Sequence, residues 1–125
     1  MTKRIMVVED NDLNRKLFCD VLRANGFEVE PVADGHLVLE TARNVAPDLI
    51  IMDIQLGGVS GVDLIAAAKR DHDLKDIPVL AVTAFAAKGD EERIRSAGAA
   101  GYLAKPVSIS PFMHAVRELL TAESV

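Results

Sequence analysis

Short apolar runs alternate along this chain with longer stretches in which apolar residues recur every three or four positions. The runs predict five β-strands, at residues 4–8, 27–32, 48–53, 78–83 and 100–104. A run without polar alternation, such as 48–53, is typical of a strand that is covered on both faces. The run 27–32 alternates and contains Pro31, which favours an edge position.

The stretches between and after these runs predict five amphipathic helices. Their apolar faces are Leu13, Leu17, Val21 and Leu22; Val38, Leu39 and Ala42; Leu64, Ile65 and Ala68; Ile94 and Ala97; and Phe112, Val116, Leu119 and Leu120. Glycines are expected to end the first and fourth helices, at Gly26 and Gly98. Asp90 is predicted to cap the fourth helix, and Ser110, which precedes Pro111, to cap the fifth.

Five strand–helix units in succession predict an α/β fold, with a parallel sheet, helices on both faces and right-handed crossovers. The 125 residues fit one domain with one core, so residues 1–125 are expected to form a single domain without a separate output domain. In such sheets the working site lies beyond the carboxyl ends of the strands. Candidate chemistry is therefore sought there.

Composition narrows the setting of that site. A net charge of −5 argues against a nucleic-acid surface, and the apolar runs are too short for a secretion signal or a membrane span. Cys19 is the single cysteine, which excludes an internal disulfide and fits a reducing cytoplasm. We interpret Cys19 as a small packing residue. The three histidines share no ligand spacing and are expected at the surface: His36, His72 and His114.

Polar residues follow four of the five predicted strands. Glu9 and Asp10 follow the first, Asp53 ends the third, Thr83 ends the fourth and Lys105 follows the fifth. Two carboxylates ~4 Å apart repel by about 4 kcal/mol at an effective dielectric near 20, so three of them need a cation. Because the expected ligands are all oxygens, Mg²⁺ is the predicted ion, with Mn²⁺ as an alternative. Mg²⁺ and Lys105 together would balance the charge of three carboxylates.

An aspartate held at the end of a buried strand, beside a cation and a lysine, can accept a phosphoryl group as an aspartyl-phosphate. Taken alone, each residue has a simpler interpretation. A strand-terminal aspartate is usually a turn or a helix cap, which is the prediction for Asp12 and Asp34. Lys105 alone would be a surface lysine, and Thr83 alone a β-former. The joint pattern at four strand ends favours a phosphoacceptor at Asp53.

At this point the chain resembles the receiver domain of two-component response regulators. The matching stretches are "VVEDN" (7–11), "LIIMDIQL" (49–56), "SG" (60–61), "AVTA" (81–84) and "AKP" (104–106). The resemblance runs from Lys3 to Leu120 and implies a doubly wound, flavodoxin-like (CheY-like) (βα)5 sandwich of three layers with strand order 2-1-3-4-5. Residues 7–22 and 78–98 are similar to a single-domain type that acts in alphaproteobacterial cell division and polarity.

The resemblance implies a role for each matching residue. Asp53 would be the phosphoacceptor, and Lys105 would pair with the phosphoryl group. The Mg²⁺ ligands would be Glu9, Asp10, Asp53 and the backbone carbonyl of Gln55. The bond between Lys105 and Pro106 would be cis.

A switch is implied as well. Thr83 would move with the phosphoryl group, and Tyr102 would change rotamer. The small residues expected around Tyr102 are Ala81, Ala84, Ala86 and Ala87. One departure concerns Gly57, which stands where the family usually has proline and is followed by Gly58. Two glycines are expected to loosen this loop over the metal, which affects the expected phosphoryl lifetime.

The implied partners are a sensor histidine kinase or a histidine phosphotransfer protein, and a downstream protein. The downstream protein would dock on the fourth helix, the fifth strand and the fifth helix, with no nucleic acid or membrane involved.

Three alternatives remain open. A haloacid-dehalogenase-type phosphatase would need a second aspartate where Gln55 stands. A flavodoxin-like cofactor binder would need a Gly-rich loop, whereas "EDND" (9–12) repels phosphate. A receiver that docks without phosphorylation would not need the full acidic set.

Overall fold

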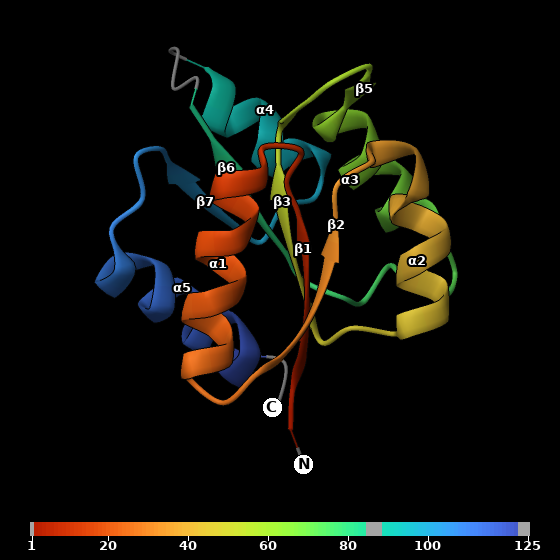
Figure 1. Ribbon diagram of the computed structural model, residues 1–125. Coiled ribbons are helices and arrows are strands. Elements are labelled where there is room, and N and C mark those ends of the chain that lie inside the picture. Colours follow the sequence, from red (N-terminus) through yellow and green to blue (C-terminus); the bar gives the residue numbers. More distant parts are fainter. Residues whose placement is uncertain (1, 85–88, 123–125) are drawn as a thin grey trace.

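The computed structural model describes residues 2–84 and 89–122, and five parallel strands form its central sheet (Figure 1). The order is β2-β1-β3-β6-β7, and every pairing in this sheet is parallel. The strands are β1 (Arg4–Val8), β2 (Glu28–Val32), β3 (Leu49–Asp53), β6 (Val79–Thr83) and β7 (Gly101–Ala104). This order confirms the predicted fold and the edge position of the strand that contains Pro31.

Helices cover both faces of the sheet (Figure 1). One face carries α1 (Asp12–Ala24) and α5 (Ile109–Ala122); the other carries α2 (Val38–Val45), α3 (Gly61–Arg70) and α4 (Asp90–Ala97). Within β1, Ile5 and Val7 pack under α1 and α5, whereas Met6 and Val8 pack toward α2, α3 and α4. Successive strand residues point to opposite faces, so covering both faces requires continuous apolar strands.

Helix α1 buries only part of the predicted face. Leu22 is buried and Val21 packs against the core, as predicted, whereas Leu13 and Leu17 are 66% and 53% exposed. Cys19 is buried as well. The ring of Phe18 stacks on that of Phe112 in α5, with centroids 5.0 Å apart. The inward face of α1 is therefore set by contacts with α5, which spacing along one helix does not show. The prediction that Cys19 is a packing residue is confirmed.

Helix caps agree with the sequence in part. Asp34 caps the short 3-10 helix η1 (Gly35–Leu37), because its Oδ1 accepts from the His36 amide at 2.9 Å. Asp12 does not cap α1: Asn11 does, accepting from the amide of Asn14. Gly26 follows the end of α1 with φ 89°, as expected of a helix-ending glycine.

The starts of α4 and α5 were predicted wrongly. Asp90 is the first residue of α4, and Gly89, with φ 92°, holds the cap position without a side-chain hydrogen bond. Helix α5 begins at Ile109, so Ser110 and Pro111 lie inside its first turn. The amide of Phe112 donates to the Ser108 carbonyl, which sets this earlier start. Gly98 does end α4.

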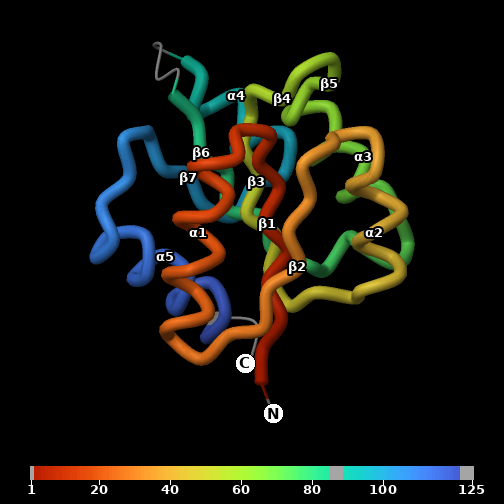
Figure 2. The backbone as a smooth tube through the Cα atoms, in the orientation of Figure 1, coloured from red at the N-terminus to blue at the C-terminus, as the bar shows by residue number. Residues whose placement is uncertain are grey.

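A small hairpin was missed altogether. Strands β4 (Gln55–Leu56) and β5 (Val59–Ser60) pair antiparallel just after β3, with Gly57 and Gly58 as the turn (Figure 2). Gly58 has φ 78°, a conformation that glycine adopts at low cost. The three histidines are exposed, as predicted. None of the helices that the structure describes is long and apolar enough to cross a bilayer.

Candidate functional site

The carboxyl ends of the central strands bring the predicted polar residues together at one edge of the sheet. Glu9 follows β1, Asp53 ends β3 and Thr83 ends β6; their exposed fractions are 1%, 4% and 1%. Lys105 follows β7, and its amide donates to the Thr83 carbonyl at 2.8 Å. The strand order alone produces this convergence, because β1, β3, β6 and β7 are successive neighbours.

Lys105 binds both buried carboxylates. Its Nζ lies 2.7 Å from Glu9 Oε1 and 3.2 Å from Asp53 Oδ2, and its side chain is 17% exposed. A backbone amide donates to the other oxygen of each carboxylate: Asn11 to Glu9 Oε2 at 3.2 Å, and Gln55 to Asp53 Oδ1 at 3.0 Å. Four charge-assisted contacts therefore fix the two carboxylates in place.

Asp10 completes the acidic cluster from an exposed position. One oxygen from each of Glu9, Asp10 and Asp53 lies within 4.8 Å of the others. The amide of Gly57 donates to Asp10 Oδ2 at 3.0 Å. An all-oxygen, partly exposed set of this kind fits Mg²⁺, which prefers carboxylates and retains several waters. The backbone carbonyl of Gln55 stays a predicted ligand.

Burial and close contacts shift the pKa values of Glu9 and Lys105. Desolvation, together with a hydrogen bond to Asp53, raises the pKa of Glu9 from 4.5 to about 7, although the contact with Lys105 lowers it. Burial also lowers the pKa of Lys105, but its hydrogen bond to Glu9 and the charge of Asp53 outweigh this and raise it. Lys105 is thus an ammonium at neutral pH. When no metal ion is bound, Glu9 is therefore partly protonated near neutral pH.

Of the two predicted switch residues, Thr83 lies at the strand ends beside this cluster. Thr83 borders a hollow of about 280 Å³ together with Ile54 and Gln55 on one side and Asp90 and Arg93 of α4 on the other. Residues from the end of β6 and the start of α4 therefore line the same hollow.

Tyr102 lies on β7 opposite Ala81 and packs, partly buried, on the α2–α4 side of the sheet. Of the small residues expected around it, Ala86 and Ala87 lie outside the described residues. The Lys105–Pro106 bond is cis, as the resemblance implied.

Sequence reasoning missed three contributors, Asn11, Arg15 and Gly57, of which Asn11 and Gly57 act through backbone amides. The cap at Asn11 could have been found, because an asparagine directly before a helical pattern is a preferred cap, but this preference does not predict the contact of its amide with Glu9. Arg15, one turn into α1, also donates to the Glu9 carbonyl at 2.9 Å. No pattern in the sequence marks the Gly57 amide as a donor to Asp10.

The fold and the site together define a class of protein. A doubly wound sheet with three carboxylates and a lysine at its carboxyl edge can hold a divalent cation and admit a phosphoryl group beside it. The chain belongs to the response regulator receiver domain family, whose profile matches residues 5–117. The resemblance seen in the sequence is confirmed.

Individual relatives narrow the comparison. The chain is 50% identical over 120 residues to the polar-differentiation response regulator DivK of Brucella ovis and of Brucella abortus, covering 96% of this chain and 98% of each relative. Among solved structures, a putative response regulator from Chloroflexus aurantiacus is similar with a TM-score of 0.92 and 29% identity, over 97% of this chain and 99% of that one.

A further solved structure bears on the cation. The receiver domain of a sensor histidine kinase from Pseudomonas aeruginosa is similar with a TM-score of 0.88 and 30% identity, over 97% of this chain and 99% of that one. That structure has a magnesium ion coordinated in its active-site cleft.

Proposed function

We propose that Asp53 accepts a phosphoryl group from a phosphohistidine and that the chain signals by docking to other proteins. The observation that carries this proposal is the placement of Asp53. It ends a fully buried strand, and Gln55 and Lys105 hold its two oxygens. A nucleophile fixed in this way needs little reorganisation before attack, which is the main contribution a protein makes to phosphoryl transfer.

In the proposed transfer, an Asp53 carboxylate oxygen forms a bond to phosphorus. The bond from phosphorus to the donor's imidazole nitrogen breaks, and its electron pair leaves on that nitrogen. Lys105 pairs with the phosphoryl oxygens, and the Thr83 hydroxyl donates a hydrogen bond to one of them. Mg²⁺, held by Glu9, Asp10, Asp53 and the Gln55 carbonyl, would neutralise negative charge on these oxygens when bound. The chain promotes its own phosphorylation and dephosphorylation and turns over no other substrate.

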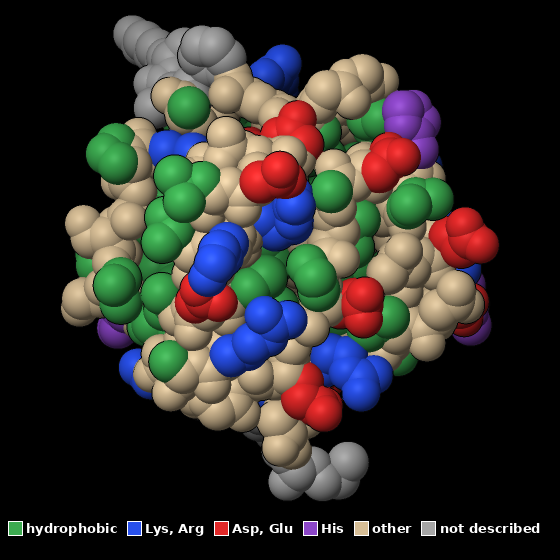
Figure 3. Space-filling view, in the orientation of Figure 1, with side chains coloured by type: hydrophobic (Ala, Val, Ile, Leu, Met, Phe, Trp, Pro, Cys, Tyr) green, Lys and Arg blue, Asp and Glu red, His purple; other side chains and the backbone are tan. Residues whose placement is uncertain are grey.

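An apolar surface beside the site suits the phosphodonor. Leu13, Leu17 and Ile109 are large, exposed apolar side chains on α1 and at the start of α5. Hydrophobic side chains gather on this side of the molecule, at the left of Figure 3. Leu17 borders a groove of about 560 Å³ that reaches Lys105 at one end. Exposed apolar side chains next to a charged site favour protein docking. We propose that a sensor histidine kinase or a histidine phosphotransfer protein docks here.

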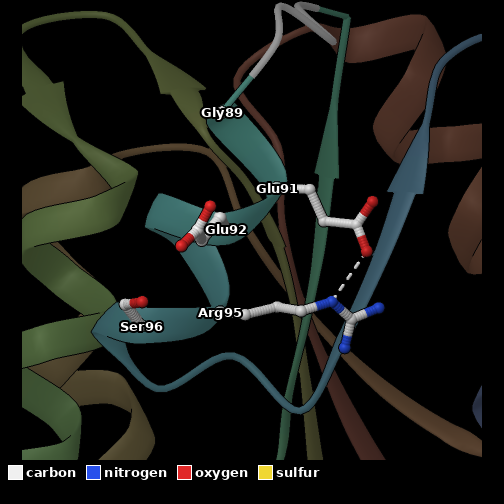
Figure 4. A pocket seen from close by; sticks show the side chains of 5 residues that line it. All are labelled: Gly89, Glu91, Glu92, Arg95 and Ser96. Carbon is white, nitrogen blue, oxygen red and sulfur yellow. Dashed lines mark hydrogen bonds and ion pairs between the residues drawn. The ribbon is translucent and has the colours of Figure 1, made fainter.

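The output surface in this proposal is the face of α4, β7 and α5. Helix α4 buries little besides Ile94, so it can shift at low cost. Its outer side carries a hollow of about 590 Å³, where Glu91 pairs with Arg95 at 2.8 Å (Figure 4). A shift of α4, coupled to Thr83 and Tyr102, would change this surface for a downstream protein. The likeness to the polar-differentiation response regulator DivK supports a role in cell division or polarity. The proposal places the chain in the cytoplasm without membrane binding, and the net charge of −5 argues against nucleic-acid binding.

Transfer from a labelled phosphohistidine donor tests the proposal. Wild type is expected to take the label from a phosphorylated histidine phosphotransfer protein in the presence of Mg²⁺, and Asp53→Asn is expected to take none. Asp63→Asn, which changes an exposed aspartate at the start of α3, is the matched control and should take label as wild type does. Equal labelling of Asp53→Asn and wild type would contradict the proposal.

A further inference from the structure

The turn after β3 lies against the acidic cluster. Strands β4 and β5 form a hairpin there (Figure 2). Its first turn residue, Gly57, donates its amide hydrogen to Asp10 Oδ2 at 3.0 Å. Asp10 and Gly57 are 47 positions apart in the chain, so this bond ties the loop after β1 to the loop after β3.

The same kind of donor serves each of the three carboxylates. Asn11 and Gln55 donate their amides to Glu9 and Asp53, as Gly57 does to Asp10. The three carboxylates differ in their other contacts: Glu9 and Asp53 are buried and share Lys105, whereas Asp10 is exposed. An exposed aspartate samples several rotamers unless a hydrogen bond selects one. The Gly57 amide therefore matters more to Asp10 than the equivalent amides matter to the other two.

Position 57 can make this bond only with a residue that has an amide hydrogen. Proline, the usual family residue in the resemblance above, has none. We propose that the Gly57 amide positions Asp10 for the divalent cation, holding one carboxylate oxygen and leaving the other for the ion. This inference rests on the metal site of the proposed function. It assigns Gly57 a positioning role, in which the amide acts on the cation through Asp10.

The local backbone allows a clean test. Gly57 is not among the residues with positive φ, and a Cβ built on it would meet Asp10 Oδ2 at 3.6 Å, an ordinary contact. Alanine therefore fits at position 57 and keeps the amide hydrogen, whereas proline removes it. Gly58, which has φ 78°, is left unchanged in both variants.

The experiment is a Mg²⁺ titration by calorimetry of wild type, Gly57→Ala, Gly57→Pro, Asp10→Ala and the double variant Asp10→Ala/Gly57→Pro. Loss of a hydrogen-bonding partner of a metal ligand typically weakens metal binding by about tenfold or more, and we expect about tenfold for Gly57→Pro. Gly57→Ala should bind Mg²⁺ as wild type does. The double variant should bind no more weakly than Asp10→Ala, because the amide acts through the Asp10 side chain, which alanine lacks.

The outcomes separate this inference from the proposed function. If wild type binds no Mg²⁺, the metal site itself fails, and this inference fails with it. If wild type binds and Gly57→Pro binds equally well, the inference is overturned while the proposed function stands. An equal loss from Gly57→Pro in the wild-type and Asp10→Ala backgrounds would place the effect in the hairpin and would also overturn it.

A second measurement applies if Gly57→Pro does not fold. Amide hydrogen exchange at Gly57, followed by NMR, is compared between wild type and Asp10→Ala without metal. The bond to Asp10 predicts several-fold slower exchange in wild type. Equal exchange rates at Gly57 in the two proteins would overturn the inference.

Discussion

Lys105 is the cation that the protein itself supplies to its buried carboxylates, and replacing it with methionine removes that charge while keeping most of the side-chain volume. The ammonium contacts Glu9 and Asp53, which are both nearly inaccessible to water. Removing one partner of a buried ion pair costs roughly 3–5 kcal/mol. Because Lys105 is partly exposed, we expect Lys105→Met to lower the free energy of unfolding by about 3 kcal/mol at neutral pH without Mg²⁺.

The pH dependence of this loss follows from Glu9. Its folded-state pKa is about 7, above the ordinary 4.5, so the folded protein binds more protons than the unfolded chain between these values. Stability from this group therefore falls as the pH rises through that window, by an amount on the order of 3 kcal/mol. Without the ammonium the pKa of Glu9 rises further. Below about pH 7 Glu9 is then protonated in both proteins, and the cost of Lys105→Met should shrink.

Urea unfolding followed by far-UV circular dichroism, at about pH 6 and about pH 8 in a chelator, measures this difference. The matched control is Lys16→Met, which removes an exposed lysine paired with Asp20 and should cost less than about 1 kcal/mol. Added Mg²⁺ should recover part of the loss at the higher pH. A loss that is equal at the two pH values, or no larger than that of the control, would refute the reasoning.

Three further predictions concern the same site. Asp10→Asn should raise the metal-free melting temperature, because it relieves repulsion between the carboxylates of the cluster. It should also remove most of the stabilisation by added Mg²⁺, and a stabilisation as large as in wild type would contradict this. Mg²⁺ binding should release protons and tighten as the pH rises through about 7, because the ion replaces the proton on Glu9; calorimetry in buffers of different ionisation enthalpy measures that release, and none would argue against it. Thr83→Ala should still accept a phosphoryl group, but beryllofluoride should then shift the NMR signals near Asp53 without those around Tyr102, whereas equal long-range shifts in both proteins would exclude Thr83 as the link.

The sheet could be predicted from the sequence because strands that are buried on both faces are continuous apolar runs. Strand β3 is apolar up to Asp53, and each of its five residues is buried. The strand ends then follow from topology, since parallel neighbours place their carboxyl ends along one edge. Glu9, Asp53 and Lys105 could be grouped before any coordinates for this reason.

Features that depend on contacts between elements could not be predicted in the same way. Leu13 and Leu17 have helical spacing, yet they are exposed because Phe18 turns the inward face of α1 toward Phe112. The pattern of apolar residues contains no information on that stacking. Similarly, Gly57 donates its amide hydrogen to Asp10, which belongs to another loop. Every residue except proline carries a backbone amide hydrogen, so the sequence does not show which amide donates to which side chain.

Phosphorylation of Asp53 is tested most directly by intact mass after incubation with acetyl phosphate and Mg²⁺. We predict that wild type gains the mass of one phosphoryl group, that the gain disappears in a chelator, and that Asp63→Asn gains it equally. Asp53→Asn should gain nothing. Peptide mapping after borohydride reduction should then place the modification on the segment that contains Asp53. A phosphoryl group of the same stoichiometry on Asp53→Asn, or its location on any other residue of wild type, would contradict the assignment of Asp53 as the phosphoacceptor.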